Sequence, residues 1–281
     1  MESMSNSRLV QEEAWKAPFM RFADYIEETG QLVEMAYTGM QAVISLHEVF
    51  GIIEEGREVP ESRISNRKEQ VKLAQRQIDS KFRLLHGHAI MGTWGSLECL
   101  IEDVVEAWMA FKPEVLRRQE FEKIKIPLAK FLGLSDDQRV RLLVSEIQRD
   151  LKLDLRSGVT KFEKLLDAVG LGGPVDPRLR DTLYEFQNVR NVLAHRAGIV
   201  DQRFVDACPS YGLQVGERVA IDEKSFTRLH NGVYTYSMVL INRILASLGR
   251  DIRHVAYPGF EGATQYGIRA NHAEVKTEPV D

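Results

Sequence analysis

Residues 177–198 carry the pattern that decides the fold, and they read Pro-Arg-Leu-Arg-Asp-Thr-Leu-Tyr-Glu-Phe-Gln-Asn-Val-Arg-Asn-Val-Leu-Ala-His-Arg-Ala-Gly. Asp176 stands directly before Pro177, as expected where a helix begins, because an aspartate caps the first turn and proline fits the first helical position. Apolar residues recur at steps of four, three and seven, namely Leu179, Leu183, Phe186 and Leu193. This spacing predicts an amphipathic helix over residues 177–194, which Gly198 ends.

Arg190 interrupts the apolar face of that helix. At about 100° per residue, it lies within roughly 20° of Leu179, in the middle of the face. A charged side chain costs energy there unless it is paired or faces a cavity. His195 lies roughly 140° from Arg190 on an ideal helix. The two side chains therefore converge only if the helix unwinds near Ala194 or if a second copy of the chain completes the site.

Two interpretations of Arg190 remain open at this point. In the first, the break in the pattern marks a functional site, because functional residues often break a local rule. In the second, Arg190 forms a buried ion pair with Glu98 or Glu102, and His195 is a cation favoured by the helix C-terminus. The spacing alone does not choose between them.

The rest of the chain is also predicted to be mainly helical. Further helices are expected over residues 9–28, 32–54, 62–111 (with interruptions at 86–88 and at Gly92 and Gly95), 113–132, 135–151 and 159–169, with a last helix after Asp222. Alternating apolar residues around Gly216 and Glu217 predict a small β-hairpin over residues 211–221. The expected fold is all-α, a helical bundle with this hairpin before its last helix.

The segment from Gly56 to Pro60 contains helix breakers and predicts a domain boundary. We expect an N-terminal helical extension over residues 1–60, a helical domain over residues 61–250 and a loose C-terminal tail over residues 251–281.

The composition is that of an ordinary globular protein. Hydrophobic residues make up 44% and charged residues 28% of the 281 residues, which argues against wholesale disorder. A net charge of -4 excludes a protein that coats nucleic acid through bulk positive charge. No apolar run approaches the ~20 residues of a membrane span, and Cys99 and Cys208 form no disulfide framework. We therefore expect a cytoplasmic protein that does not enter a membrane.

A local basic stripe is still present. Lys68, Lys72 and Arg76 are spaced by four, so a helix places them on one face. Two interpretations fit this stripe. It is either a solvated helix face or a surface that contacts the phosphates of a nucleic acid.

The segment 188–198, Asn-Val-Arg-Asn-Val-Leu-Ala-His-Arg-Ala-Gly, resembles the signature of the HEPN superfamily of helical domains in its R-N-x-x-x-H form. Two further segments agree with this resemblance. Residues 94–103 resemble the early core helix of the family, and residues 215–221 resemble the short hairpin before its last helix. The resemblance covers roughly residues 62–250.

The resemblance implies a helical bundle that dimerises and that, in many members, cuts RNA without a metal. Some members are non-catalytic, and the family serves toxin–antitoxin, phage-defence and RNA-processing systems. The implied catalytic residues are Arg190, Asn191 and His195. Histidine can act as an acid or a base near neutral pH, and arginine matches phosphate oxygens with its planar fork. We expect Glu98 and Glu102 to support the catalytic residues. The expected RNA-binding residues are Lys68, Lys72, Arg76 and Arg196.

We therefore expect a metal-independent endoribonuclease whose site is shared across a homodimer and whose substrate is RNA. The alternative is a non-catalytic helical interaction or RNA-binding module. No cofactor is expected, and no metal, because His86 and His88 have no carboxylate or cysteine at ligand spacing. A further partner would be an antitoxin or a regulatory protein. The extension 1–60 is a sensor, a dimerisation arm or an antitoxin-docking surface, and its composition does not choose.

Overall fold

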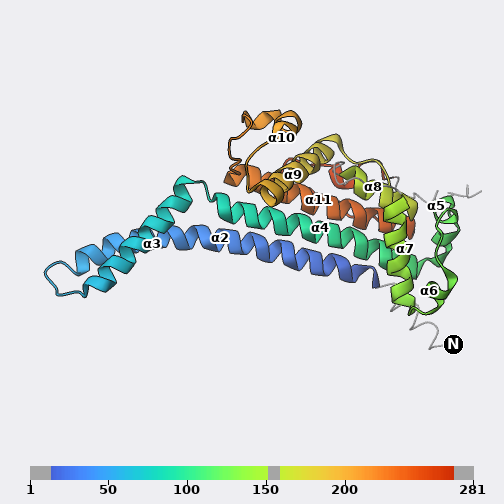
Figure 1. The fold of residues 1–281 in the computed structure, drawn as a ribbon, viewed down its shortest axis with the longest axis horizontal. Helices are drawn as coiled ribbons and strands as arrows, with labels where there is room; N and C mark the ends of the chain where they lie inside the picture. The colour runs from blue at the N-terminus through green and yellow to red at the C-terminus, as the bar shows by residue number, and fades with distance from the viewer. Residues whose placement is uncertain (1–13, 151–158, 269–281) are drawn as a thin grey trace, which may run out of the picture. The chain divides into compact units, whose positions relative to one another are not determined.

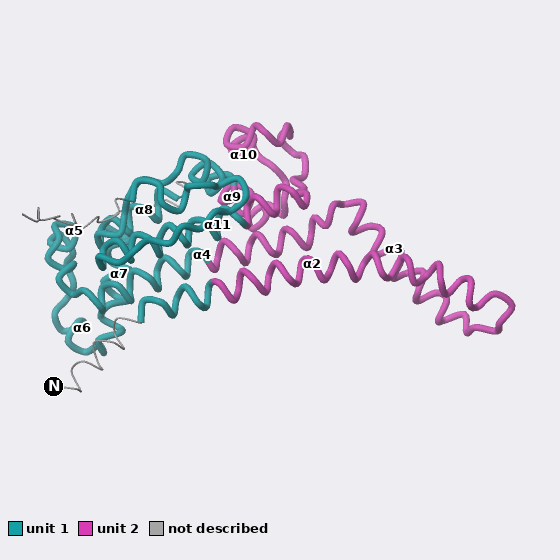
Figure 2. The backbone as a smooth tube through the Cα atoms, turned by 180° about the vertical axis from the view of Figure 1, so that it is seen from behind, with its two compact units in different colours: residues 1–22, 97–185, 231–281 teal, residues 23–96, 186–230 magenta. Residues whose placement is uncertain are grey.

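The computed structural model describes residues 14–150 and 159–268, and within these residues the regular structure is entirely helical (Figure 1). The prediction of an all-α fold is confirmed. The chain forms two compact units, drawn in different colours in Figure 2. Unit 1 comprises Met1–Phe22, Leu97–Glu185 and Asn231–Asp281, and unit 2 comprises Ala23–Ser96 and Phe186–His230. The predicted partition into an extension, a domain and a tail remains a prediction.

The α-helices of the described residues are α2 Lys16–Ile53, α3 Glu61–Asp79, α4 Arg83–Phe111, α5 Gln119–Glu122, α6 Leu128–Leu132, α7 Asp136–Asp150, α8 Val159–Ala168, α9 Pro177–Arg196, α10 Gln202–Ala207 and α11 Glu223–Ser247. Short 3-10 turns occupy Pro113–Arg117, Pro209–Tyr211 and Ala263–Gln265. No helix in this part of the chain has an apolar stretch sufficient to cross a bilayer. The cytoplasmic location remains a prediction.

Helix α2 is continuous where two helices with a break near Gly30 were expected, so that prediction is wrong. Ile26 and Val33 on either side are buried, and this packing outweighs the roughly 1 kcal/mol that a glycine costs inside a helix. A Cβ at Gly30 would lie 3.8 Å from Cε1 of His230, so α11 comes close to α2 at this position. The glycine serves this approach and does not end the helix.

Helix α4 also runs without the predicted interruptions at residues 86–88, Gly92 and Gly95. The break lies earlier, where Lys81 and Phe82 both have a φ of 54°, in the left-handed region that side chains rarely adopt. Gly92 is needed for packing instead, because a Cβ there would collide with the Tyr25 hydroxyl.

The predicted break over residues 56–60 is confirmed, since α2 ends at Ile53 and α3 begins at Glu61. Arg67 of α3 pairs with Glu54 and lies over the ring of Phe50, 5.1 Å from its centroid. The hydrogen bond from Arg67 lowers the pKa of the Glu54 carboxyl. These contacts fix α3 against the C-terminal end of α2.

The predicted hairpin over residues 211–221 is wrong, because the described residues contain no strand. The segment pairs instead with the chain that leaves α9, through an isolated antiparallel bridge between Ile199 and Arg218. The Val200 amide donates to the Glu217 carbonyl at 2.9 Å, and the Val219 amide donates to the Gly198 carbonyl at 2.9 Å. The Glu217 carbonyl and the Val219 amide are therefore satisfied by the segment that follows α9.

The expected tail does not begin loosely at residue 251. The amide of Asn242 donates to the carbonyls of Arg253 at 2.9 Å and Thr264 at 2.8 Å, and Phe260 and Ala263 are buried. Residues up to 268 are thus packed within unit 1. Residues 269–281 lie outside the described residues.

Candidate functional site

Helix α9 begins as the sequence predicts. Oδ1 of Asp176 accepts a hydrogen bond from the Arg178 amide at 2.9 Å, and Pro177 occupies the first helical position. Its hydrogen bonds with Arg178 lower the pKa of the Asp176 carboxyl, so the cap is ionised.

The buried face of α9 differs from the predicted one. Val189 and Val192 are buried at 0% and 5% exposure, so the apolar face continues from Phe186 in steps of three. Arg190 lies at the border of that face and is half-buried, and Leu193 is half-buried as well. The predicted position of Arg190 in the middle of the face is therefore wrong. The pattern failed because a helix with buried residues at steps of three shifts its face gradually round the axis.

Within unit 2, α9 packs on α4 at two points. Phe186 stacks on Trp94 with ring centroids 5.5 Å apart. A Cβ at Gly87 would lie 3.5 Å from Cδ2 of Leu193, so the missing side chain at Gly87 lets α9 pack closely against α4. These two contacts hold the last turns of α9 in a defined orientation.

The predicted catalytic residues occupy these last turns. Arg190 donates from Nη1 to Oδ1 of Asn191 at 3.3 Å, so the structure brings two of the three together. His195 is exposed and makes no hydrogen bond or ion pair among the described residues. Because α9 remains helical through Arg196, the helix does not unwind near Ala194. Arg190 and His195 therefore project about 140° apart within one chain.

A sharp turn closes the end of α9. Ala197 and Gly198 have φ values of 50° and 82°, which turn the chain sharply out of the helix. The Gly198 amide donates to the carbonyl of Val192 at 3.0 Å and closes the last turn. Nε of Arg196 pairs with Oδ2 of Asp201 at 3.0 Å, so this predicted RNA-binding residue is partly neutralised.

Arg218 is a residue of this surface that the sequence interpretation missed. It is exposed, forms no ion pair among the described residues, and would lie 3.7 Å from a Cβ at Gly198. The backbone pairing with Ile199 carries it there. Its only signal in the sequence was its place in the segment 215–221. We call Arg190, Asn191, His195, Arg196 and Arg218 the α9-end surface.

The predicted supporting carboxylates lie in unit 1, whereas Arg190 lies in unit 2. Glu98 pairs with Nζ of Lys161 at 3.4 Å, and Glu102 accepts from Nε2 of Gln148 at 2.8 Å. Their predicted support of Arg190 remains a prediction.

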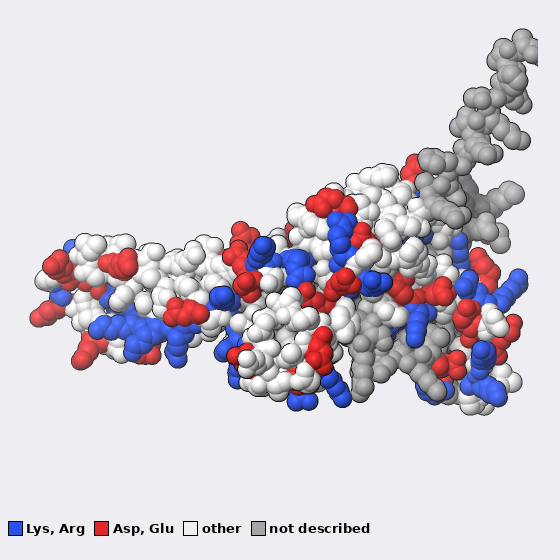
Figure 3. Space-filling model, turned by 90° about the horizontal axis from the view of Figure 1, so that it is seen from above, with Lys and Arg blue, Asp and Glu red and all other residues white. Residues whose placement is uncertain are grey.

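The basic stripe Lys68, Lys72 and Arg76 lies on α3 with all three side chains exposed. Lys72 pairs with Glu69 at 2.9 Å, and Nε of Arg76 donates to the Lys72 carbonyl at 3.3 Å. Figure 3 shows acidic side chains interspersed with basic ones over this part of the molecule. Figures 1 and 2 place α3 away from the end of α9, so the stripe does not border the α9-end surface.

A second histidine, His86, has a structural environment. It is fully buried in unit 2, its Nδ1 lies 2.5 Å from the Ile221 carbonyl, and its Nε2 meets the Tyr37 hydroxyl. Burial lowers the pKa of His86, and burial with the charge of Glu223 raises the pKa of Tyr37 to about 12. His86 is therefore neutral, donating from Nδ1 and accepting from the hydroxyl of Tyr37.

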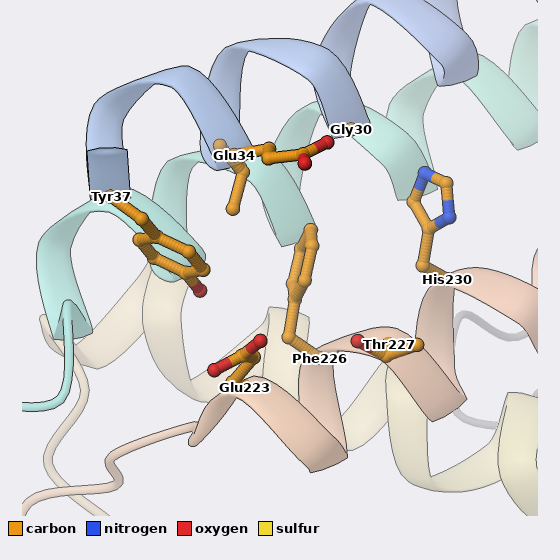
Figure 4. Close-up of a pocket in the computed structure, with 8 residues that line it drawn as sticks. Gly30, Glu34, Tyr37, Glu223, Phe226, Thr227 and His230 are labelled. Atoms are coloured by element: carbon orange, nitrogen blue, oxygen red, sulfur yellow. The ribbon is translucent and has the colours of Figure 1, made fainter. Parts of the chain in front are cut away.

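A pocket of about 330 Å³ opens beside this cluster, between α2 and the first turns of α11 (Figure 4). Gly30, Glu34 and Tyr37 line it from α2, and Glu223, Phe226 and His230 line it from α11. His230 holds its Nε2 3.2 Å from the Ile26 carbonyl, and burial lowers its pKa. The described residues contain no cluster of three or more histidine, cysteine or acidic side chains suited to a metal ion.

Comparison with protein-family models, with curated proteins and with solved structures finds no match for this chain.

Proposed function

We propose that this protein is a metal-independent endoribonuclease of the HEPN type, which acts as a homodimer through Arg190, Asn191 and His195. The observation that supports the proposal is the exposed His195 without an intramolecular partner, at a helix end that also presents Arg218. An exposed imidazole can exchange a proton with a substrate, and a neighbouring guanidinium can bind a phosphate. Resemblance of residues 188–198 to the family signature supplies the reaction class.

In the proposed reaction the 2′-oxygen of a ribose attacks the adjacent phosphorus and loses its proton to a base. The bond from phosphorus to the 5′-oxygen of the next nucleotide breaks, and that oxygen takes a proton from an acid. The products are a 2′,3′-cyclic phosphate and a 5′-hydroxyl. Arginine side chains offset the charge that builds on the phosphorane oxygens. Each acid or base role is worth about 10²–10⁴-fold in rate.

The geometry of α9 supports the proposed dimer. One chain offers one histidine in this surface, and Arg190 projects about 140° away from that histidine. A two-fold interface presents the same surface twice, so it supplies a base and an acid to one phosphate. The family uses such nucleases in toxin–antitoxin and phage-defence systems, and we extend that context to this chain as part of the proposal.

The test is cleavage of a mixed-sequence RNA in excess chelator by wild type and by His195→Ala. His254→Ala is the matched control, because His254 is another exposed histidine but belongs to unit 1. We expect wild type and His254→Ala to cleave equally and His195→Ala to lose at least about 100-fold in rate. Equal cleavage by all three would rule out the proposed site. RNA binding without cleavage by any of them would favour the alternative, a non-catalytic RNA-binding module.

A further inference from the structure

Helix α2 carries an exposed apolar seam in addition to its buried face. On the buried face, Val33 is 4% exposed, Tyr37 meets His86, and Phe50 lies under Arg67. Figure 1 shows α4 running along one side of α2, and α3 crossing the C-terminal part of α2. The other side presents a set of residues spaced alternately by three and four, which are Leu32, Met35, Gly39, Ala42, Leu46, Val49 and Ile53. All seven are exposed, and the five large ones are between 46% and 68% exposed.

This spacing is the heptad repeat of a coiled coil. Residues at alternating steps of three and four keep one seam facing a partner helix over many turns. The seam extends for about 32 Å. It exposes apolar area on the order of 500 Å², which is a size of patch that marks an interaction site on a monomer. No charged residue interrupts it.

Gly39 lies at the centre of the seam. Glycine inside a helix is destabilising relative to alanine. A Cβ at Gly39 would meet nothing within 4 Å among the described residues, as would a Cβ at Gly51, which lies outside the seam. The absence of a side chain at Gly39, followed by the small Ala42, lets another helix backbone approach closely at the centre of the seam.

The seam is complementary to itself in the antiparallel direction. When residue i of one chain faces residue 81 minus i of the other, Gly39 faces Ala42, Met35 faces Leu46, and Leu32 faces Val49. The small residues then meet at the two-fold axis, and large residues meet on both sides of it. An isologous interface requires this kind of self-complementarity.

Charges at the ends of the seam favour the antiparallel direction over the parallel one. The antiparallel register places Glu28, the next position of the seam, opposite Ile53 of the partner subunit, and it leaves Asp24 beyond the end of the partner's α2. A parallel register would instead place Asp24 opposite Asp24 and Glu28 opposite Glu28. Like charges in such positions oppose association.

From these observations we infer that residues 32–49 of α2 form an antiparallel coiled-coil interface with a second copy of this chain. The interface is separate from the α9-end surface and does not depend on the proposed nuclease function. Of the three roles expected for residues 1–60, this interface supports that of a dimerisation arm.

The first test places a carboxylate in the seam and, as a control, outside it. Gly39→Glu and Gly51→Glu change charge and helix propensity equally, and neither position has a neighbour within 4 Å of its Cβ. Only residue 39 lies in the seam. Mass is measured by light scattering over a range of concentrations. We expect Gly39→Glu to weaken association at least about 100-fold and halve the mass, and Gly51→Glu to match wild type. A monomeric wild type, or equal masses for wild type and Gly39→Glu, would overturn the inference.

The second test determines the direction of the two helices. In a Cys99→Ser background, Leu32→Cys and Val49→Cys are introduced singly and together, and the full-length protein is oxidised. The antiparallel register predicts a disulfide-linked dimer only when both cysteines are present. Dimers from each single variant would mean that the helices are parallel and would overturn the proposed register. A Gly39→Glu variant that keeps the wild-type dimer mass and still cleaves RNA would leave the nuclease proposal standing while the seam fails.

Discussion

His86 and His195 are the same side chain in opposite surroundings, both within unit 2. His86 is fully buried, stacks on Phe226 at 4.9 Å between ring centroids, and has a partner for each ring nitrogen. His195 is exposed on the last turn of α9 and has no intramolecular partner among the described residues. A histidine whose two nitrogens are both engaged holds helices together, whereas one with both nitrogens open to solvent can exchange protons with a substrate.

The comparison shows that His86 has a structural environment. The pair His86 and His88 had the spacing that first suggests a metal, yet His86 bonds to Tyr37 and to the Ile221 carbonyl. Its nitrogens are therefore used in joining α2, α4 and the segment before α11. The contrast between the two histidines yields four further predictions.

The largest difference should appear in catalysis. Replacing His195 with alanine should lower the RNA cleavage rate by about 10²–10⁴-fold, because it removes the proposed acid or base. The melting temperature, followed by circular dichroism, should not change, since His195 makes no hydrogen bond or ion pair within the part of the chain that the structure describes. A variant that melts at a much lower temperature would show that His195 is a structural residue.

The opposite result is expected for His86. His86→Ala should lower the free energy of unfolding by about 2–4 kcal/mol, because it leaves a cavity and two buried polar groups without partners. Chemical denaturation measures this change directly. Tyr37→Phe removes only the hydroxyl and should cost less, about 1 kcal/mol. Wild-type stability in His86→Ala would contradict the structural role.

Arg218 tests how far the α9-end surface extends. Arg218→Ala should lower the cleavage rate roughly 10-fold through the loss of one phosphate contact, with an unchanged melting temperature. Arg203→Ala on α10 is the control, because Arg203 is another exposed arginine without an ion pair in the described part of unit 2. Equal rates for the two variants would remove Arg218 from the site.

The smallest effect concerns the pH dependence of stability. Burial lowers the pKa of His86 and of His230 in the folded state. At a pH below the ordinary pKa of histidine, the unfolded chain therefore binds more protons than the folded chain. The stability that they contribute is present above about pH 6.5 and is lost as the pH falls toward their folded pKa values. We expect the melting temperature to fall by a few degrees between pH 7.5 and 5.5. The slope should be smaller in His86→Gln and unchanged in His195→Ala.

Local signals in the sequence predicted local features correctly. Asp176 and Asp222 cap α9 and α11, and the break at residues 56–60 separates α2 from α3. Each depends on residues adjacent in the chain, so propensity and capping chemistry were sufficient. His195 at the end of α9 was placed correctly for the same reason.

The errors arose where distant segments meet. Gly30 remains inside α2 because it faces His230, which is 200 residues away in the chain. Residues 217–219 pair with residues 198–200 and not with a hairpin partner. The same pairing carries Arg218 to the end of α9, and no periodicity in the sequence could have shown that. The environment of His86 likewise depends on Tyr37 and Ile221, which lie far from it in the sequence.

The chemical ends of the RNA products test the central claim most directly. A short RNA is incubated with wild type in excess chelator, and its products are analysed by mass spectrometry beside a substrate with a 2′-deoxynucleotide at the cleavage position. The α9-end surface predicts 2′,3′-cyclic phosphate and 5′-hydroxyl ends, no cleavage of the deoxy substrate, and no products from His195→Ala. Products with 3′-hydroxyl and 5′-phosphate ends, or cleavage at the 2′-deoxynucleotide, would contradict the account.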